Sequence, residues 1–323
     1  MKAILIDQDK SLRWGDAATP VPSPGEVLIK VHATAINRAD LIQRRGGYPP
    51  PPGASPILGL ECAGEVAGLG AGVGGWEAGD RVCALLAGGG YAEYAVAPAG
   101  CVRRLPRGFS FVHGAALPEV FATAWLNLFM EAGLKPGESA ILHAGASGVG
   151  TAAIQLCHSF GNPCYVTAGS AAKIAVCMEL GAAGGSDRKA GSFFEAASHF
   201  AGARGVDVIL DPVGGAYFTD NLRLLAMNGR LVLIGLMGGS KSEVDLGLLM
   251  AKRARLIGST LRARPNAEKA AVMQQLEENV WPRLEAGEIR PIVDTTFDIR
   301  DAGEAQDLIA SDKTVGKVVL LVN

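Results

Sequence analysis

The chain has 323 residues, which is enough for about two domains and a sizeable buried core. Its 30 Lys and Arg residues and 32 Asp and Glu residues leave a formal net charge of −2, so no long-range field favours nucleic acid or an anionic membrane surface. Apolar residues make up 49% of the chain and charged residues 19%, which excludes a disordered protein.

The cysteines, the N-terminal residues and the longest uncharged stretch indicate the cellular compartment of the protein. The six cysteines form no C-x-x-C pair, and unpaired thiols fit a reducing compartment. Residues 1–10 lack the apolar run of a signal peptide. The longest uncharged stretch, 139–172, is interrupted by glycines and by Pro163, so it reads as buried core and not as a membrane span. We expect a cytoplasmic protein.

Short alternating runs dominate the chain from residue 26 to about 120. Examples are EVLIKVHA, GEVAGLG, DRVCALL and YAEYAVAP, which turn residues separate. This pattern predicts a barrel-like β domain. Within it, the five prolines and three glycines of residues 43–56 predict a surface loop of the kind that borders active sites.

After residue 118 the pattern changes to apolar strand, glycine turn and helix. The strands SAILHAG, CYVTAG, VDVILD and RLVLIG do not alternate, which predicts a parallel sheet covered on both faces. Residues 149–160 and 171–180 have helical spacing, and Gly181 is the expected C-terminal cap of the second helix.

The last part of the chain returns to the first pattern. After about residue 261, AEKAAVMQQLEENVWPRL predicts one charged helix. The terminal run KVVLLVN predicts a strand that rejoins the first domain.

The strongest chemical signal is HAGASGVG, His143 to Gly150, between a predicted strand and a predicted helix. A dinucleotide pyrophosphate needs unobstructed backbone N–H donors at a helix N-terminus, which Gly148, Val149 and Gly150 are expected to supply. The spacing is G-x-x-G-x-G instead of the usual G-x-G-x-x-G. The alternative is a glycine turn that only lets the helix pack close to the sheet.

The second predicted strand indicates which nicotinamide cofactor is bound. A site that prefers NAD has an acidic residue about 20 residues after the glycine turn, but here the strand ends Thr167-Ala168-Gly169-Ser170. Lys173 and Arg188 follow, so a hydroxyl and two cations favour the 2′-phosphate of NADPH. The alternative is that Ser170 caps the next helix and Lys173 is a solvated surface charge.

Several strings carry a family resemblance. They are NRADL (37–41), YPPPPGAS (48–55), ILGLE (57–61), HAGASGVGTAAIQL (143–156), GLMGG (235–239) and GKVVL (316–320). Through them the whole chain resembles the zinc-independent, zeta-crystallin-like quinone oxidoreductases of the medium-chain dehydrogenase/reductase superfamily, in particular the subgroup induced by a tumour-suppressor transcription factor.

This resemblance implies an α/β fold with two domains. A GroES-like β-barrel domain is expected over 1–119, completed by 260–323, and an inserted Rossmann domain with a doubly wound parallel sheet over 120–259. The resemblance also implies a homodimer, which we expect to form through an edge strand RLVLIG.

The resemblance also implies the site residues. Asn37 and Tyr48 are the catalytic candidates. Arg188 stands where the relatives have a tyrosine. The cofactor-binding candidates are Asn37, Tyr48, Thr123, Gly145, Ala146, Ser147, Gly148, Val149, Gly150, Gly169, Ser170, Lys173, Arg188, Leu236, Met237, Ser259 and Leu261.

Zinc alcohol dehydrogenases share this architecture, but their ligand pattern is missing. Gly59-Leu60-Glu61 stands where a G-H-E histidine is expected, and Asn37 to Asp40 replace the surroundings of the first ligand. Cys62 and His32 are isolated, and lone Cys and His residues are usually structural. We expect no metal.

The expected activity is hydride transfer from NADPH to a quinone, with a water or the Tyr48 hydroxyl supplying protons. On spacing alone, Asn37 reads as an Asx-turn, Tyr48 as a half-exposed loop aromatic and Arg262 as an exposed arginine. Two alternatives remain, namely reduction of activated C=C bonds in enones and an NADPH-binding protein whose turnover is incidental.

Overall fold

The computed structural model describes residues 1–323, and its contacts divide the chain into two compact units. Unit 1 comprises Met1–Ala122 and Leu261–Asn323, and unit 2 comprises Thr123–Thr260. The boundaries expected from the sequence, 119/120 and 259/260, lie within a few residues of these. No helix is long and apolar enough to cross a membrane.

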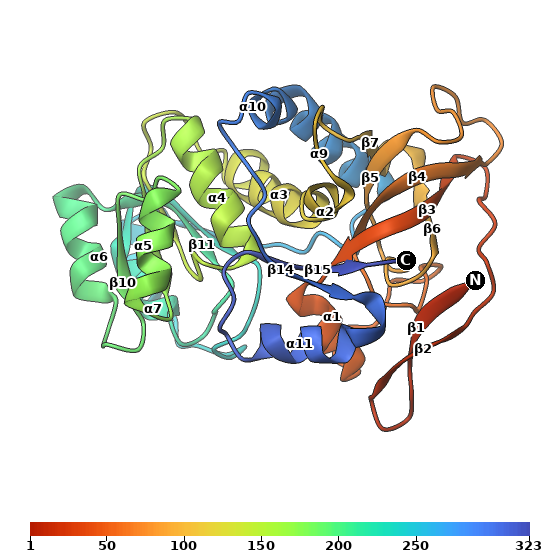
Figure 1. Cartoon of the computed structure of the whole chain (residues 1–323). Coiled ribbons are helices and arrows are strands. Elements are labelled where there is room, and N and C mark those ends of the chain that lie inside the picture. The colour runs from red at the N-terminus through yellow and green to blue at the C-terminus, as the bar shows by residue number, and fades with distance from the viewer. The chain divides into compact units, whose positions relative to one another are not determined.

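Unit 1 is built mainly from β-strands, and Figure 1 labels most of its elements. Its strands are β1 Lys2–Ile6, β2 Leu12–Asp16, β3 Glu26–Ala35, β4 Glu61–Leu69, β5 Arg81–Leu85, β6 Tyr94–Pro98, β7 Val102–Arg104, β14 Val293–Asp298 and β15 Lys317–Leu321. Its helices are α1 Arg38–Arg44, α2 Phe111–Ala115, α9 Asn266–Asn279, α10 Trp281–Glu285 and α11 Ala302–Ala310, with 3-10 turns η1 Ala99–Cys101 and η4 Ile299–Asp301.

The C-terminal strand of unit 1 lies beside its N-terminal strands. The main sheet has the order β14-β15-β3-β4-β5-β7, and β6 pairs with β3. β15 is antiparallel to β3, with Val319 opposite Ala35 (Figure 1). The predicted return of the terminal strand to the first domain is therefore confirmed. Because β15 pairs with β3 in the same sheet, residues from the N-terminal and C-terminal parts of the chain share one core.

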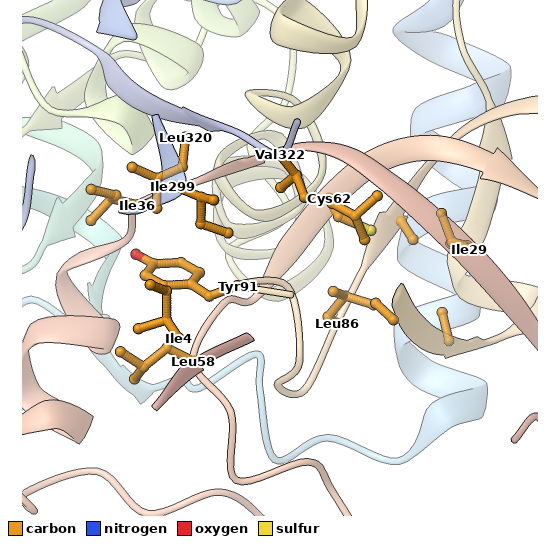
Figure 2. Close-up of a cluster of buried hydrophobic side chains, with 14 of the residues drawn as sticks. Ile4, Ile29, Ile36, Leu58, Cys62, Leu86, Tyr91, Ile299, Leu320 and Val322 are labelled. Atoms are coloured by element: carbon orange, nitrogen blue, oxygen red, sulfur yellow. The ribbon is translucent and has the colours of Figure 1, made fainter. Parts of the chain in front are cut away.

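That core is apolar and fully enclosed. In Figure 2 the ring of Tyr91 lies beside Ile4 and Leu58, with its hydroxyl oxygen at the end of the ring nearest Ile36. Leu320 and Ile299 come from the C-terminal segment and belong to the same cluster. Apolar burial at roughly 25 cal/mol per Å² makes such a cluster the main stabilising element of the unit.

Two details of unit 1 differ from the sequence prediction. The single helix expected over 267–284 is two helices, α9 and α10, which Val280 separates. Pro282 has no N–H to donate within a continuing helix, and it stands in the first turn of α10, where none is needed. The loop expected over 43–56 begins only after α1 ends at Arg44.

Unit 2 alternates strands and helices. Its strands are β8 Ala140–Leu142, β9 Cys164–Ala168, β10 Gly184–Asp187, β11 Val206–Asp211, β12 Leu225–Leu233 and β13 Arg255–Gly258. Its helices are α4 Gly148–Ser159, α5 Ala171–Glu179, α6 Phe194–Ala201, α7 Phe218–Leu224 and α8 Leu246–Ala251, with a π-helical segment η2 Leu126–Glu131 and a 3-10 turn η3 Gly202–Arg204. Helix α3, Pro118–Trp125, contains the division between the units.

The six strands of unit 2 form one parallel sheet in the order β10-β9-β8-β11-β12-β13. This is the doubly wound order of dinucleotide-binding domains, with the reversal between β8 and β11. β9 and β11 are buried throughout, as expected for strands covered on both faces.

The sheet edge differs from our expectation. RLVLIG belongs to β12, which pairs with β11 on one side and β13 on the other, so it is an interior strand. The edge strand on that side is β13, with the similar sequence RLIG, and β10 forms the opposite edge. The expectation that RLVLIG is the edge strand is therefore wrong, because a later segment with a weaker strand signal pairs outside it.

Candidate cofactor site and buried charge network

The cofactor candidates of unit 2 gather at the carboxyl ends of the parallel strands. The glycine turn follows β8, Gly169 and Ser170 follow β9, and Arg188 follows β10. Leu236 and Met237 come shortly after β12, and Ser259 directly after β13. In open α/β sheets this edge, at the point where the strand order reverses, is where ligands bind.

The glycine turn is held by close backbone contacts. A Cβ atom on Gly145 would lie 2.7 Å from Val166 Cβ, so the turn packs directly on β9. A Cβ atom on Gly150 would lie 2.4 Å from the carbonyl oxygen of Ala144. Ala144 itself has a φ of 55°, in the left-handed region. Both glycines are therefore required by the tight geometry of the turn.

The start of α4 has the donor set that a pyrophosphate requires. Ser147 is the N-cap, and its Oγ accepts from the Gly150 amide at 3.0 Å. Gly148 and Val149 occupy the first turn, where an α-helix provides no carbonyl for its amide N–H groups. Two backbone donors and the positive end of the helix dipole thus lie beside Ala146 and Ser147. The residues fit a dinucleotide phosphate.

The end of β9 brings three polar candidates together. Ser170 caps α5 and accepts from the Lys173 amide at 3.3 Å, so the capping interpretation is confirmed. Lys173 is only 8% exposed, so its alternative interpretation as a solvated surface charge is wrong. The Arg188 amide donates to the Ala168 carbonyl at 2.9 Å, which fixes this residue beside Gly169. Parallel pairing of Asp187 with Ala168 explains the contact.

The remaining candidates differ in environment. Leu236 and Met237 are more than half exposed on a loop whose Met237 amide donates to the Pro212 carbonyl. Ser259 is nearly buried, and its amide donates to Leu233. Thr123 lies on α3, where its carbonyl accepts from Asn127. Leu261, the first residue of unit 1 after the insertion, is buried.

His143, which begins the glycine turn, is held by a buried polar network. Its Nε2 lies 2.7 Å from Asn221 Oδ1 and its Nδ1 lies 3.0 Å from Thr167 Oγ1. Asn221 donates in turn to Asp211 Oδ2 at 3.0 Å. Burial lowers the pKa of His143, while the charge of Asp211 opposes the shift. These contacts link the ends of β8, β9 and β11, so His143 has a structural role.

Asn37 in unit 1 is the centre of a second buried network. Its Nδ2 donates to Glu61 Oε1 at 2.9 Å and to the Ala35 carbonyl at 3.3 Å, while Lys317 Nζ donates to its Oδ1 at 2.7 Å. Lys317 and Glu61 form an ion pair at 2.8 Å, and the Glu119 amide donates to Glu61 Oε2 at 2.9 Å. Both hydrogens of the Asn37 amide are therefore committed within the protein.

Asp40 lies next to this network. Its Oδ2 accepts from the Asn37 amide at 2.8 Å and from the Tyr91 hydroxyl at 3.1 Å, and its Oδ1 accepts from the Gly59 amide at 3.2 Å. Complete burial nevertheless raises the pKa of Asp40 to about 6, with these hydrogen bonds and the charge of Lys317 opposing the shift.

Tyr48 and Arg262 are in direct contact. The Arg262 guanidinium lies 5.3 Å from the Tyr48 ring centroid, and its Nη1 donates to the Tyr48 carbonyl at 3.2 Å. Its Nε donates to the Ala87 carbonyl at 2.7 Å. Arg262 is only 3% exposed, so the default expectation of an exposed arginine is wrong. Burial and the charge of Glu119 raise the pKa of Tyr48, and Arg262 lowers it.

Sequence reasoning missed most of the buried charges of unit 1. It did not single out Glu119 or Lys317, and it treated Glu61 and Asp40 only as replacements for zinc-ligand positions. A signal was present, since Glu61 stands in ILGLECAG and Lys317 in VGKVVLLV, both otherwise uncharged. A charge inside an apolar strand is rarely buried without a partner.

No group of three or more His, Cys, Asp or Glu side chains has the arrangement of a metal site.

Two family models match the chain. The alcohol dehydrogenase GroES-like domain matches residues 23–107, and the zinc-binding dehydrogenase model matches residues 148–278. The quinone oxidoreductase of Rattus norvegicus is 31% identical over 309 residues, which is 95% of this chain and 92% of the rat protein.

Solved structures agree over the full length. A mycobacterial protein complexed with NADPH has a TM-score of 0.87 and 30% identity, and the match covers 100% of both chains. The JamJ enoyl reductase has a TM-score of 0.88 and 25% identity, covering 100% of this chain and 99% of that chain. The strand order of unit 2, the β-sheet of unit 1 and these matches agree with the α/β fold expected from the sequence. The chain belongs to the medium-chain dehydrogenase/reductase superfamily, in its zeta-crystallin-like quinone oxidoreductase branch, and is a nicotinamide-dependent oxidoreductase.

Proposed function

We propose that the protein is an NADPH-dependent quinone reductase that works without a metal. The observation that carries the proposal is the end of β9, where Ser170, the nearly buried Lys173 and Arg188 gather and no acidic residue follows the strand. A carboxylate there would bind the ribose hydroxyls of NAD and repel a 2′-phosphate. The rat relative named quinone oxidoreductase and the NADPH complex of the mycobacterial protein support the same choice.

In this proposal the glycine turn binds the pyrophosphate. The Gly148 and Val149 amides donate to it at the N-terminus of α4, and Ala146 and Ser147 line the approach. Lys173 and Arg188 neutralise the 2′-phosphate, and Gly169 leaves room for it. Leu236, Met237, Ser259, Leu261 and Thr123 are assigned to the nicotinamide side.

The acceptor is proposed to be an easily reduced carbonyl compound. Bound reduced nicotinamide supplies a hydride, and the protein supplies proximity and exclusion of water. Leu60 stands where zinc relatives have a histidine ligand, so this position cannot bind a Lewis-acidic zinc ion. The acceptor must therefore be electron-poor enough to take the hydride without a metal. Quinones meet that demand. Asn37, held by Glu61 and Lys317, is assigned a positioning role, and Tyr48 is assigned to contact the acceptor.

The cofactor proposal is tested by dissociation constants for NADPH and NADH in the native protein, in Lys173→Ala and in Lys135→Ala. Loss of a charged phosphate contact costs on the order of 1.5–3 kcal/mol for NADPH and little for NADH. Lys135 is exposed and precedes β8, so it is the matched control. Equal losses for both cofactors in Lys173→Ala would remove the phosphate assignment.

A second candidate function is reduction of an activated C=C bond, which the likeness to an enoyl reductase favours. Parallel rates with an ortho-quinone and an enone, each with NADPH and NADH, separate the two activities. Tight NADPH binding with no turnover of either acceptor supports instead an NADPH-binding protein with incidental activity.

We also propose a homodimer through β13, the edge strand of unit 2 that lies next to β12. Large apolar side chains are exposed on this strand and on nearby segments, which is unfavourable in water. They are Met227, Leu246, Met250 and Leu256. Light scattering on the native protein and on Leu256→Lys tests the dimer, which the added charge is expected to weaken.

All six cysteines are unpaired and buried, which fits the reducing cytoplasm.

A further inference from the structure

Unit 1 contains two buried polar atoms that have no hydrogen-bond partner and belong to side chains in one electrostatic cluster. One is Oε2 of Glu119 and the other is Nη2 of Arg262. The charge of Glu119 acts on both Tyr48 and Arg262, so the three side chains lie within electrostatic range of each other. Unpartnered buried polar atoms are rare in folded proteins and cost roughly 1–3 kcal/mol each. Other side chains of the unit also have such an atom, among them Gln43 and Gln306, but Glu119 and Arg262 are the pair whose opposite charges act on each other, so one ligand can complete both.

Two of the three guanidinium nitrogens of Arg262 donate to backbone carbonyls, and the third, Nη2, has no acceptor. Its Nε and Nη1 are committed to the Ala87 and Tyr48 carbonyls, and the side chain is only 3% exposed. These bonds hold the planar guanidinium in one orientation. Nη2 therefore presents a fixed cationic donor to an oxygen atom.

Glu119 is equally fixed at its backbone. Its amide donates to Glu61 Oε2 at 2.9 Å, so this residue of the first turn of α3 is held against the ion pair of Glu61 with Lys317. The charged groups that act on its carboxyl are Glu61, Asp40, Lys317 and Arg262, and the charge of Glu119 acts in turn on Tyr48. Burial and the charge of Glu61 raise the pKa of Glu119 to about 8, while Lys317 and Arg262 oppose the shift. The carboxyl thus holds its proton at neutral pH.

Tyr48 is the weaker acid of the two. Its pKa lies above the ordinary tyrosine value for the same physical reason, burial, and the neighbouring carboxyl adds to the shift. A proton donor is most effective when its pKa lies near the working pH. Glu119 meets this condition and Tyr48 does not.

We propose that Arg262 and Glu119 bind the polar end of the acceptor, where Arg262 Nη2 binds the acceptor oxygen and Glu119 gives it a proton. This inference rests on the proposed quinone reduction. The hydride adds two electrons and one hydrogen to the quinone, leaving a hydroquinone monoanion. The O–H bond of the Glu119 carboxyl breaks, its proton joins the anionic oxygen, and water reprotonates the carboxylate. The sum is quinone, NADPH and one proton converted to hydroquinone and NADP⁺.

The proton step is tested with Glu119→Gln, which keeps the shape of the side chain but has no acidic proton. In the native enzyme kcat/KM for a benzoquinone is expected to fall about tenfold per pH unit above about 8, the pKa of Glu119. Glu119→Gln is expected to lose about a hundredfold in kcat and to lose this alkaline limb. The control is Glu268→Gln, in which an exposed carboxylate paired with Arg264 is changed.

Two measurements do not depend on turnover. The infrared C=O stretch of a protonated carboxyl with a titration midpoint near pH 8 is expected in the native protein. In Glu119→Gln this component is expected to be absent, while the component from Asp40, with a midpoint near pH 6, stays. Binding of 4-nitrophenolate, an anionic phenol that resembles the hydroquinone monoanion, is expected to weaken about tenfold in Arg262→Lys, which lacks the planar donor pair. Arg300→Lys, an exposed arginine paired with Asp298, is the control.

The outcomes separate this inference from the proposed function. If Glu119→Gln alters the pH profile, Arg262→Lys weakens phenolate binding and both variants keep the native NADPH affinity, the inference and the proposed function are both supported. Native quinone turnover and an unchanged pH profile in Glu119→Gln overturn the proton role while leaving quinone reduction intact. Undiminished phenolate binding in Arg262→Lys overturns the oxygen-binding role. Absence of quinone turnover in the native protein, with the infrared and phenolate results as expected, rejects quinone as the acceptor and leaves only the oxyanion-binding role of Arg262 and the protonated state of Glu119 in place.

Discussion

Lys317 Nζ lies 2.8 Å from Glu61 Oε1, with 4% and 0% of the two side chains exposed. This ion pair joins the C-terminal strand β15 to β4, and Lys317 also donates to the Ile36 carbonyl and to Asn37. A buried pair contributes little net stability, but removal of one partner leaves an uncompensated charge.

Lys317→Met is therefore expected to lower the free energy of unfolding by about 3–5 kcal/mol. Urea unfolding of the full chain measures the change. The double variant Lys317→Met with Glu61→Gln is expected to recover part of the loss, since it leaves no charge unpaired. Lys30→Met, at an exposed position of β3, is the control and is expected to be near neutral. A loss of similar size in the control would contradict the assigned cause.

The raised pKa of Glu119 predicts a pH dependence of stability. Between the ordinary value of 4.5 and the folded value of about 8, the folded protein holds a proton that the unfolded chain has released. Unfolding then releases a proton, so the native protein loses stability as pH rises through this window, by up to roughly 1.4 kcal/mol per pH unit. Burial of Asp40 adds a similar loss between pH 3.8 and about 6.

Urea unfolding of the native protein and of Glu119→Gln between pH 5 and 9 separates the two carboxyls. From pH 5 to pH 8 the native protein is expected to lose stability relative to Glu119→Gln, and above pH 8 the difference in unfolding free energy is expected to level. The contribution of Asp40 cancels in this difference because both proteins contain it. A difference that stays constant across this range would show that Glu119 ionises normally.

Two glycine substitutions are expected to have opposite effects. Gly150→Ala places a methyl group 2.4 Å from the Ala144 carbonyl oxygen, so the glycine turn must shift, with an expected loss of about 1–3 kcal/mol. Gly303→Ala adds a methyl group with nothing within 4 Å on α11 and is expected to stabilise by about 0.5–1 kcal/mol. Thermal unfolding measures both, and NADPH titration is expected to detect a loss only in Gly150→Ala.

Two N-cap serines form a further matched pair. Ser147 caps α4 at the glycine turn, and Ser110 caps α2 in unit 1. Alanine at either position is expected to cost about 0.5–2 kcal/mol of stability, because one amide loses its acceptor. Only Ser147→Ala is expected to weaken NADPH binding as well, which calorimetric titration measures. Equal NADPH affinity in the two variants would argue against a pyrophosphate at α4.

The parts of the fold that were predicted correctly depend on local patterns. Uninterrupted apolar runs predicted the parallel strands β8, β9 and β11, since such strands must be covered on both faces. The run KVVLLV predicted the returning strand β15, and the position of Gly181, with a φ of 109°, predicted the end of α5. The glycine turn was also evident, because its strand, its N-cap serine and its helix are contiguous in sequence.

Tertiary structure alone decided the environment of the charged residues and the position of the sheet edge. Glu61 and Lys317 are far apart in the chain, and the pairing of β15 with β3 and of β3 with β4 brings them into contact. Arg262 has an ordinary sequence context, and its burial follows from the carbonyls of Ala87 and Tyr48, which distant segments supply. Composition and periodicity report how a segment meets water and its own neighbours, whereas a buried charge depends on partners that only the folded chain brings together.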